Sequence, residues 1–337
     1  MENEWQRLPL GSILAIVPMY LSKISSVLIC VAVLLHSGCK ENDPVNPDGF
    51  DKGQNRYTLT VESTEREYYV HVPEAYTGDT ATAVVFMLHG TSGNGLDMWT
   101  RSGWKEVGEA ENILTVYPSS LRYCIIDSVD GQKNTTKWNS QPAEWMFCQN
   151  ETPRDDIRFL TEVIADLKGR FNVDAKRIYL VGFSNGGQMT AKCSIEMSDQ
   201  FAATVSNAGS FYVDSAFIPK RKLPTTFQLG NEDYGPGNTG PAISLSLIDT
   251  ILHNLDYKPA KVASTHIKSF GLSPDYVVTG DTSTAIIATY PSLTPGSVND
   301  YRFVFVKGLG HSYPNGTNHW MVAAPLHWNW LKQYRLP

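Results

Sequence analysis

The feature that most constrains the fold is the pentapeptide Gly182-Phe183-Ser184-Asn185-Gly186. It follows an apolar run at 177–181, which is typical of a buried strand, and precedes a helical pattern at 185–197. A strand that turns sharply into a helix around G-x-S-x-G exposes the serine hydroxyl at the carboxyl end of a sheet, and the glycines relieve crowding in the turn. The sequence therefore predicts Ser184 as a nucleophile.

Strand-like and helix-like segments alternate from residue 57 onward. We expect an N-terminal antiparallel hairpin and then buried strands, at 57–61, 67–72, 83–88, 114–117, 177–181, 202–206, 225–229 and 301–306. Helical periodicity occurs at 155–170, 185–197, 243–255 and 325–333. This alternation predicts an α/β fold, with a mostly parallel central sheet and helices on both faces. Residues 235–300 fit it least, and we expect an insertion there.

A serine hydroxyl needs a base within hydrogen-bonding reach. For a G-x-S-x-G strand–turn–helix the chain order is serine, then acid, then histidine, so the histidine is expected after the last strand. His311 follows the strand at 301–306 through a loop with two glycines, and it is the predicted base. Other histidines that the sequence leaves open are His253, His266, His319 and His327, whereas His89 is expected to be structural.

The acid is expected in the loop after the strand at 225–229. Both Glu232 and Asp233 qualify by position, and we favour Asp233 as the residue that orients the imidazole. Weaker candidates, in helical or loop positions, are Asp249, Asp256, Asp275 and Asp281.

Acyl transfer also needs hydrogen-bond donors for the developing oxyanion. One predicted donor is the backbone N–H of Asn185, directly after the nucleophile. The second is expected from the loop after the strand at 83–88, where Gly90 allows a close approach and the N–H of Thr91 is the candidate.

Several motifs occur together in one order: Leu88-His89-Gly90, Asp155-Asp156, Val173-Asp174, Gly182–Gly187 with Gln188-Met189, Gly230–Asp233 and Gly308–Pro314. As a set they resemble the polyhydroxybutyrate depolymerase and feruloyl esterase group of α/β-hydrolases. The resemblance covers roughly residues 57–334. It implies an α/β-hydrolase fold with Ser184, Asp233 and His311 as the triad, and with Thr91 and Asn185 as oxyanion donors.

The same resemblance suggests residues that contact the substrate. Trp138-Asn139 resembles a Trp-Asn pair near the active site of that group, so both are candidates for the acyl pocket, with a packed loop aromatic as the alternative for Trp138. Many relatives have tryptophan after the catalytic histidine loop, where this chain has Ser312-Tyr313-Pro314. Tyr313 is therefore a candidate for that role, and the difference leaves substrate choice open.

The N-terminal segment, residues 1–39, reads as a signal for export. A short apolar run at 24–35 follows Lys23 and ends at Ser37-Gly38-Cys39, which resembles a bacterial lipobox with Cys39 as the lipidated residue. Met19 is an alternative start. A plain cleaved signal or an uncleaved anchor are the other interpretations. Polar residues at 40–56 are expected to tether a catalytic domain at 57–337, placing it on the outer membrane, at the cell surface, or secreted.

Two of the remaining cysteines, Cys124 and Cys148, flank a polar loop and are the better disulfide candidates in an oxidising compartment. Cys193 lies in a predicted helix and is expected to be a buried apolar residue. The net charge of −6 argues against a nucleic-acid partner. No His/Cys/Asp cluster has metal-ligand spacing, and no metal or organic cofactor is expected.

These features predict a serine esterase without cofactor that acts on an ester substrate. Feruloyl or acetyl esters of polysaccharide, and hydroxyalkanoate oligomers of the polyhydroxybutyrate type, are the candidate substrates. A serine peptidase of the same fold and a non-catalytic carbohydrate-binding surface lipoprotein are the alternatives. Oligomeric state is left open by the sequence.

Overall fold

The centre of the fold is a ten-stranded sheet, accompanied by a separate two-stranded hairpin. The computed structural model describes residues 50–127, 130–140 and 147–337, all of which lie in one compact unit, Asn46–Pro337. The strands of the large sheet are β1 (Gly53–Val61), β2 (Thr64–Val72), β3 (Thr82–Leu88), β4 (Leu114–Pro118), β7 (Val173–Phe183), β8 (Thr204–Asn207), β9 (Thr225–Gly230), β10 (Val277–Asp281), β11 (Ala285–Tyr290) and β12 (Tyr301–Val306). The hairpin consists of β5 (Arg122–Asp127) and β6 (Gly131–Thr136).

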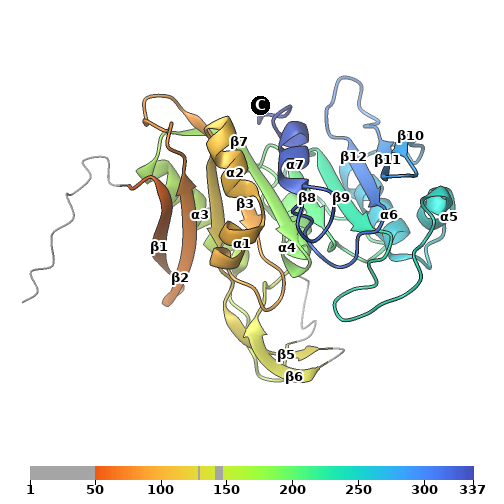
Figure 1. Ribbon diagram of the computed structural model, residues 1–337, viewed down its shortest axis with the longest axis horizontal. Coiled ribbons are helices and arrows are strands. Elements are labelled where there is room, and N and C mark those ends of the chain that lie inside the picture. The colour runs from red at the N-terminus through yellow and green to blue at the C-terminus, as the bar shows by residue number, and fades with distance from the viewer. Residues whose placement is uncertain (1–49, 128–129, 141–146) are drawn as a thin grey trace, which may run out of the picture. The chain divides into compact units, whose positions relative to one another are not determined.

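The strand order is β1-β2-β4-β3-β7-β8-β9-β12-β11-β10, with β1 and β10 at the two edges (Figure 1). The strands from β4 to β12 in this order run parallel, whereas β1 and β2 at one end and β11 and β10 at the other pair antiparallel. The predicted mostly parallel sheet and N-terminal hairpin are therefore confirmed. Because the central strands are parallel, their carboxyl ends meet along one edge.

Helices connect the strands and cover the sheet. They are α1 (Gly95–Arg101), α2 (Trp104–Glu111), α3 (Asp156–Arg170), α4 (Asn185–Glu196), α5 (Ile248–His253), α6 (Lys258–Phe270) and α7 (Ala323–Leu331), with a short 3₁₀ helix, η1 (Leu245–Leu247). Asp155 caps α3 by accepting a hydrogen bond from the N–H of Arg158, as expected of an acidic residue at a helix N-terminus.

Alternate side chains of β3 separate two hydrophobic cores. Val84 and Phe86 pack in one core with residues of α3, α4, α5 and α6. Val85 and Met87 pack in the other with residues of α1, α2 and α7. Since successive side chains of a strand point to opposite faces, a strand buried on both faces is apolar throughout, which explains the continuous apolar run in the sequence. The prediction of helices on both faces is confirmed.

The start of the domain differs from the prediction. β1 begins at Gly53, which pairs with Val72, so residues 53–56 belong to the sheet and not to a tether. The polar residues Gln54 and Arg56 are exposed on this edge strand. The start of the strand therefore lacks the apolar run from which strands were predicted.

The 235–300 region is more regular than the predicted insertion. It holds η1, α5, α6, β10 and β11, and β11 pairs with β12 to extend the sheet. The helix expected at 243–255 is divided between η1 and α5. All residues of β10 are exposed, and its sequence has no alternation of apolar and polar residues that would predict a strand.

The N-terminal predictions lie outside the described residues, including Met19, Cys39 and most of the expected tether. Within the described ranges, no helix combines the length and apolar character that crossing a membrane requires.

His266 of α6 is a buried titratable side chain that packs against β12. Its ring is buried and stacks on Tyr301 at a centroid distance of 4.3 Å, and Nδ1 hydrogen-bonds the carbonyl of Val262. Burial lowers the pKa of His266 from 6.5 to about 4, so the folded protein holds it neutral. The unfolded chain takes up a proton as pH falls below 6.5, so the stability that His266 contributes is lost between about pH 6.5 and pH 4.

We expect His266→Phe, which keeps a stacked ring, to make unfolding less sensitive to acid. The slope of unfolding free energy against pH should fall by about 1.4 kcal/mol per pH unit below pH 6. Urea denaturation of both proteins at pH 7, 6 and 5 measures the slopes. Parallel slopes would show that His266 is protonated in the folded state.

Candidate active site

Ser184 lies in the turn between β7 and α4. Its backbone has φ 55° and ψ −120°, a strained conformation that a non-glycine residue rarely adopts. The N–H of Ser184 donates to the carbonyl of Asn207 at 2.8 Å, which fixes the turn to β8. A Cβ added at Gly182 would lie 2.1 Å from the carbonyl oxygen of Gly186, and one added at Gly186 would lie 2.4 Å from that of His89. Both glycines of the pentapeptide are therefore required by close backbone packing.

His311 joins Ser184 to Asp233. Its Nε2 lies 2.8 Å from Ser184 Oγ, and its Nδ1 lies 2.9 Å from Asp233 Oδ1. A carboxylate only accepts hydrogen bonds, so the hydrogen of the neutral ring is on Nδ1 and the Nε2 lone pair faces the serine hydroxyl. Asp233 Oδ1 also accepts from the N–H of Gly235 at 2.9 Å. The side chain of Asp233 is 3% exposed, whereas that of His311 is 15% exposed. This arrangement can accept a proton from the hydroxyl as it attacks.

The ring of His311 is also held by packing, because Phe183 lies against it at a centroid distance of 5.2 Å. Phe183 immediately precedes the serine, so the elbow itself supports the histidine. The three triad positions come from the ends of β7, β9 and β12, which all reach the same edge of the sheet.

The two predicted oxyanion donors belong to segments that flank Ser184. Asn185 is the first residue of α4 and is 3% exposed. A Cβ added at Gly90 would lie 3.1 Å from Ser184 Cβ, so the loop that carries Thr91 passes directly beside the serine. Within the described residues, the N–H groups of Thr91 and Asn185 donate to no other protein group. They are therefore free to bind an oxygen atom of a ligand.

Solved structures with a similar fold include two enzymes named for ester or thioester hydrolysis. An acetyl xylan esterase from Aspergillus awamori is 11% identical with a TM-score of 0.52, covering 82% of this chain and 99% of that one. An S-formylglutathione hydrolase from Agrobacterium tumefaciens is 12% identical with a TM-score of 0.52, covering 84% and 95%. The chain has the α/β-hydrolase fold.

Sequence relatives of this chain carry esterase names. NocK of Nocardia uniformis subsp. tsuyamanensis, assigned as an esterase, is 23% identical over 77% of this chain and 74% of its own length. Feruloyl esterase B of Piromyces equi is 29% identical over 42% of this chain, and the match spans 24% of its own length. The prolyl oligopeptidase family matches residues 142–237, which include Ser184 and Asp233 but not His311.

The other candidates for acid and base lie elsewhere in the fold. Glu232 is exposed beside Asp233. His319 accepts from the N–H of Met321 and reaches the carbonyl of Lys307 through Nε2. His327 is buried between Tyr313 and Gln228, and burial lowers its pKa to about 3. The remaining candidates for acid and base form no hydrogen bond with Ser184 or His311. They are His253, His266, Asp249, Asp256, Asp275 and Asp281.

Tyr313 does not form a substrate wall. It is 6% exposed, its hydroxyl accepts from Trp104 Nε1 at 2.9 Å, and the same hydroxyl lies 3.1 Å from Nδ1 of His327. The prediction for Tyr313 is wrong because this ring completes the core beneath α7 and its hydroxyl is used there.

Trp138 is fully buried, whereas Asn139 beside it is half-buried and stays a predicted pocket residue. Trp138 is 0% exposed, and so the packed alternative holds and the acyl-pocket prediction is wrong for this residue. Asn139 donates its backbone N–H to Asp156 Oδ2 at 2.7 Å and its side-chain amide to the carbonyl of Arg154. Asp156 in turn forms a buried ion pair with Arg66 at 2.7 Å, which ties the 138–139 segment to β2.

The β5–β6 hairpin supports the loop beside Ser184, and the sequence analysis missed it. The N–H of Ser92 donates to the carbonyl of Thr136 at 3.0 Å, and Thr136 Oγ1 donates to the carbonyl of Gly93 at 2.6 Å. The strand β6 (Gly131–Thr136) has no apolar side chain, so apolar periodicity cannot identify it. The short apolar run Tyr123–Ile126 in β5 is the weak sequence signal that was available.

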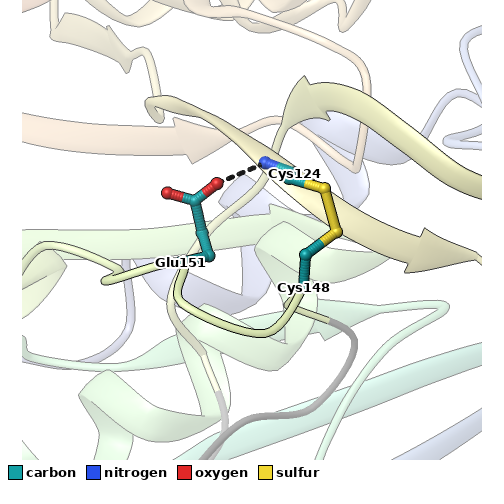
Figure 2. The surroundings of a disulfide bond; sticks show 3 residues. All are labelled: Cys124, Cys148 and Glu151. Atoms are coloured by element: carbon teal, nitrogen blue, oxygen red, sulfur yellow. Dashed lines mark hydrogen bonds between the residues drawn. A yellow bond between two sulfur atoms is a disulfide. The ribbon is translucent and has the colours of Figure 1, made fainter.

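The disulfide bond predicted for Cys124 and Cys148 is present (Figure 2). It joins β5 to the segment that precedes α3, and Glu151 accepts from the N–H of Cys124 at 2.7 Å. Cys193 is free and buried in α4, and burial raises the pKa of its thiol well above 9. The described residues contain no group of His, Cys, Asp and Glu side chains placed to hold a metal ion.

Proposed function

We propose that this α/β-hydrolase is a serine carboxylic-ester hydrolase that acts through an acyl-enzyme. The observation that carries the proposal is the continuous chain of hydrogen bonds from Asp233 through His311 to Ser184. His311 takes the proton of Ser184 as the hydroxyl attacks the ester carbonyl. The tetrahedral intermediate places its oxyanion at the N–H groups of Thr91 and Asn185. His311 then protonates the leaving alcohol, and water activated in the same way releases the acid.

The substrate that we propose is an ester of a plant polysaccharide, feruloyl or acetyl. The relatives named as feruloyl esterase B and as the bifunctional acetylxylan esterase/xylanase XynS20E of Neocallimastix patriciarum support this class. The chain spans about a quarter or less of those two proteins, so their other parts have no counterpart in the match. Hydroxyalkanoate oligomers are the second substrate class.

We also propose that the protein is exported and held at the membrane through Cys39. The Cys124–Cys148 disulfide supports an oxidising compartment, because such bonds persist mainly outside the reducing cytosol. Palmitate labelling of wild type but not of Cys39→Ser is the expected result. Equal labelling of both would remove the anchor from the proposal.

The experiment for the proposed activity uses wild-type protein and two readouts. We expect release of p-nitrophenol from p-nitrophenyl acetate, and labelling by diisopropyl fluorophosphate at the peptide that contains Ser184. Methyl ferulate, acetylated xylan and hydroxybutyrate oligomers then rank the substrate classes. Absence of turnover on every ester, or labelling only at other residues, would contradict the proposal.

A serine peptidase is the second candidate, since the prolyl oligopeptidase family matches the region around Ser184 and Asp233. The same protein is therefore assayed with glycyl-prolyl-p-nitroanilide. Cleavage of this amide at a kcat/KM above that for all esters would favour the peptidase.

A further inference from the structure

Trp138 lies between the two segments that carry the proposed oxyanion donors, the N–H groups of Thr91 and Asn185. Its backbone N–H donates to Asn185 Oδ1 at 2.7 Å, and its indole N–H donates to the carbonyl of His89 at 2.9 Å. Neither bond is exposed to solvent competition, because Trp138 and His89 are 0% exposed and Asn185 is 3% exposed. One residue therefore hydrogen-bonds the start of α4 and the loop after β3 at the same time.

The Asn185 end of this connection is fixed in orientation. Since the Trp138 N–H can only donate, the oxygen of the Asn185 amide must face it. The amide nitrogen then donates to Ser140 Oγ at 2.9 Å, to Gln188 Oε1 at 3.2 Å and to the carbonyl of Trp138 at 3.3 Å. The side chain of Asn185 is thus fully used in holding its own backbone against the 138–140 segment.

The His89 end is equally constrained. The N–H of Ser120 donates to His89 Nε2 at 2.9 Å, so the ring hydrogen is on Nδ1, which donates to the carbonyl of Gly90 at 2.7 Å. Burial lowers the pKa of His89 to about 4, which keeps the ring neutral. The indole of Trp138 packs on this ring at a centroid distance of 5.0 Å. His89 and Gly90 are therefore held immediately before Thr91.

An oxyanion hole works only when its donors are already in place, because a misplacement of about 1 Å can cost roughly 100-fold in rate. We propose that Trp138 is a positioning residue that sets the spacing between the N–H groups of Thr91 and Asn185. The proposal rests on the proposed esterase function and adds a determinant of its rate. Trp138 acts through these two backbone groups and touches no reacting atom.

The test compares Trp138→Phe with Trp99→Phe. The first removes an indole N–H that holds His89, whereas the second removes a buried indole N–H that has no partner within the described residues. For p-nitrophenyl acetate we expect kcat of Trp138→Phe to fall by about 10- to 100-fold with KM changed less than about twofold. Trp99→Phe should stay within about twofold of wild type in both constants.

The inhibition constant of a trifluoromethyl ketone is a second readout, and a general loss of packing would not change it. Such ketones add to the serine as charged tetrahedral adducts, so their affinity follows the oxyanion contacts. The inhibition constant of Trp138→Phe should rise by the same factor as kcat/KM falls. Unchanged kcat and inhibition constant, or a change in KM alone, would overturn the positioning role.

Asn185→Ala is the second variant, and it decides the question where Trp138→Phe does not fold. It keeps the backbone N–H and removes the side-chain contacts to Trp138 and Ser140. A parallel fall in kcat and ketone affinity supports the proposal, and wild-type values overturn it. Failure of the esterase function itself is distinguishable, because wild type would then release no p-nitrophenol in the same assay.

Discussion

Ser184→Ala is expected to lower kcat for ester hydrolysis by about 10⁶-fold. The triad works as one unit, so without the hydroxyl neither His311 nor Asp233 has a group to activate. The residual rate should come from binding and from the oxyanion donors, which the substitution leaves in place. Substrate affinity should change little, because the hydroxyl contributes mainly in the transition state. The measurement is p-nitrophenol release under saturating substrate.

Ser210→Ala is the matched control for this variant. Ser210 is buried, at 0% exposure, and its hydroxyl has no hydrogen-bond partner within the described part of the chain. It should retain wild-type kcat. A Ser184→Ala protein that folds and keeps more than about one hundredth of the wild-type rate would show that another group is the nucleophile, since triad serines contribute far more.

The sequence alone predicts the triad positions well because each follows a strong local pattern. Ser184 lies between two glycines at which an added Cβ would collide with the backbone, so packing requires the glycines of the pentapeptide. Asp233 and His311 directly follow β9 and β12, and parallel strands bring their carboxyl ends to one edge whatever the distance in sequence. An acidic residue and a histidine at these two strand ends are therefore what the expected chain order predicts.

The residues around the triad are harder to predict, because their positions depend on contacts between distant segments. Tyr313 and Trp138 are aromatic residues near the site in sequence, yet both are buried with their polar atoms bonded to Trp104 and His89 respectively. An aromatic residue that lines a pocket and one that fills a core have the same local pattern. The strand β6 is missed for the related reason that it is defined by its pairing with β5 and carries no apolar periodicity.

Asp233→Ala is expected to lower kcat by about 10⁴-fold, because the imidazole loses both its orientation and the charge that stabilises it when protonated. Glu232→Ala, which changes the exposed neighbouring carboxylate, should stay within about twofold. These two variants separate the acid candidates that the sequence left open. Comparable losses in both, or a loss only in Glu232→Ala, would assign the acid differently.

Asp233→Asn should retain more activity than Asp233→Ala, for a reason specific to this site. Oδ1 of Asp233 accepts from both His311 Nδ1 and the N–H of Gly235, while Oδ2 has no hydrogen-bond partner among the described residues. The Gly235 N–H selects an acceptor at the Oδ1 position, so an asparagine should place its oxygen there and its NH₂ at the position of Oδ2. The tautomer of His311 is then preserved and only the charge is lost, so kcat should exceed that of Asp233→Ala by about tenfold or more. Equal loss in the two variants would mean that the amide turns its NH₂ toward His311 and reverses the tautomer.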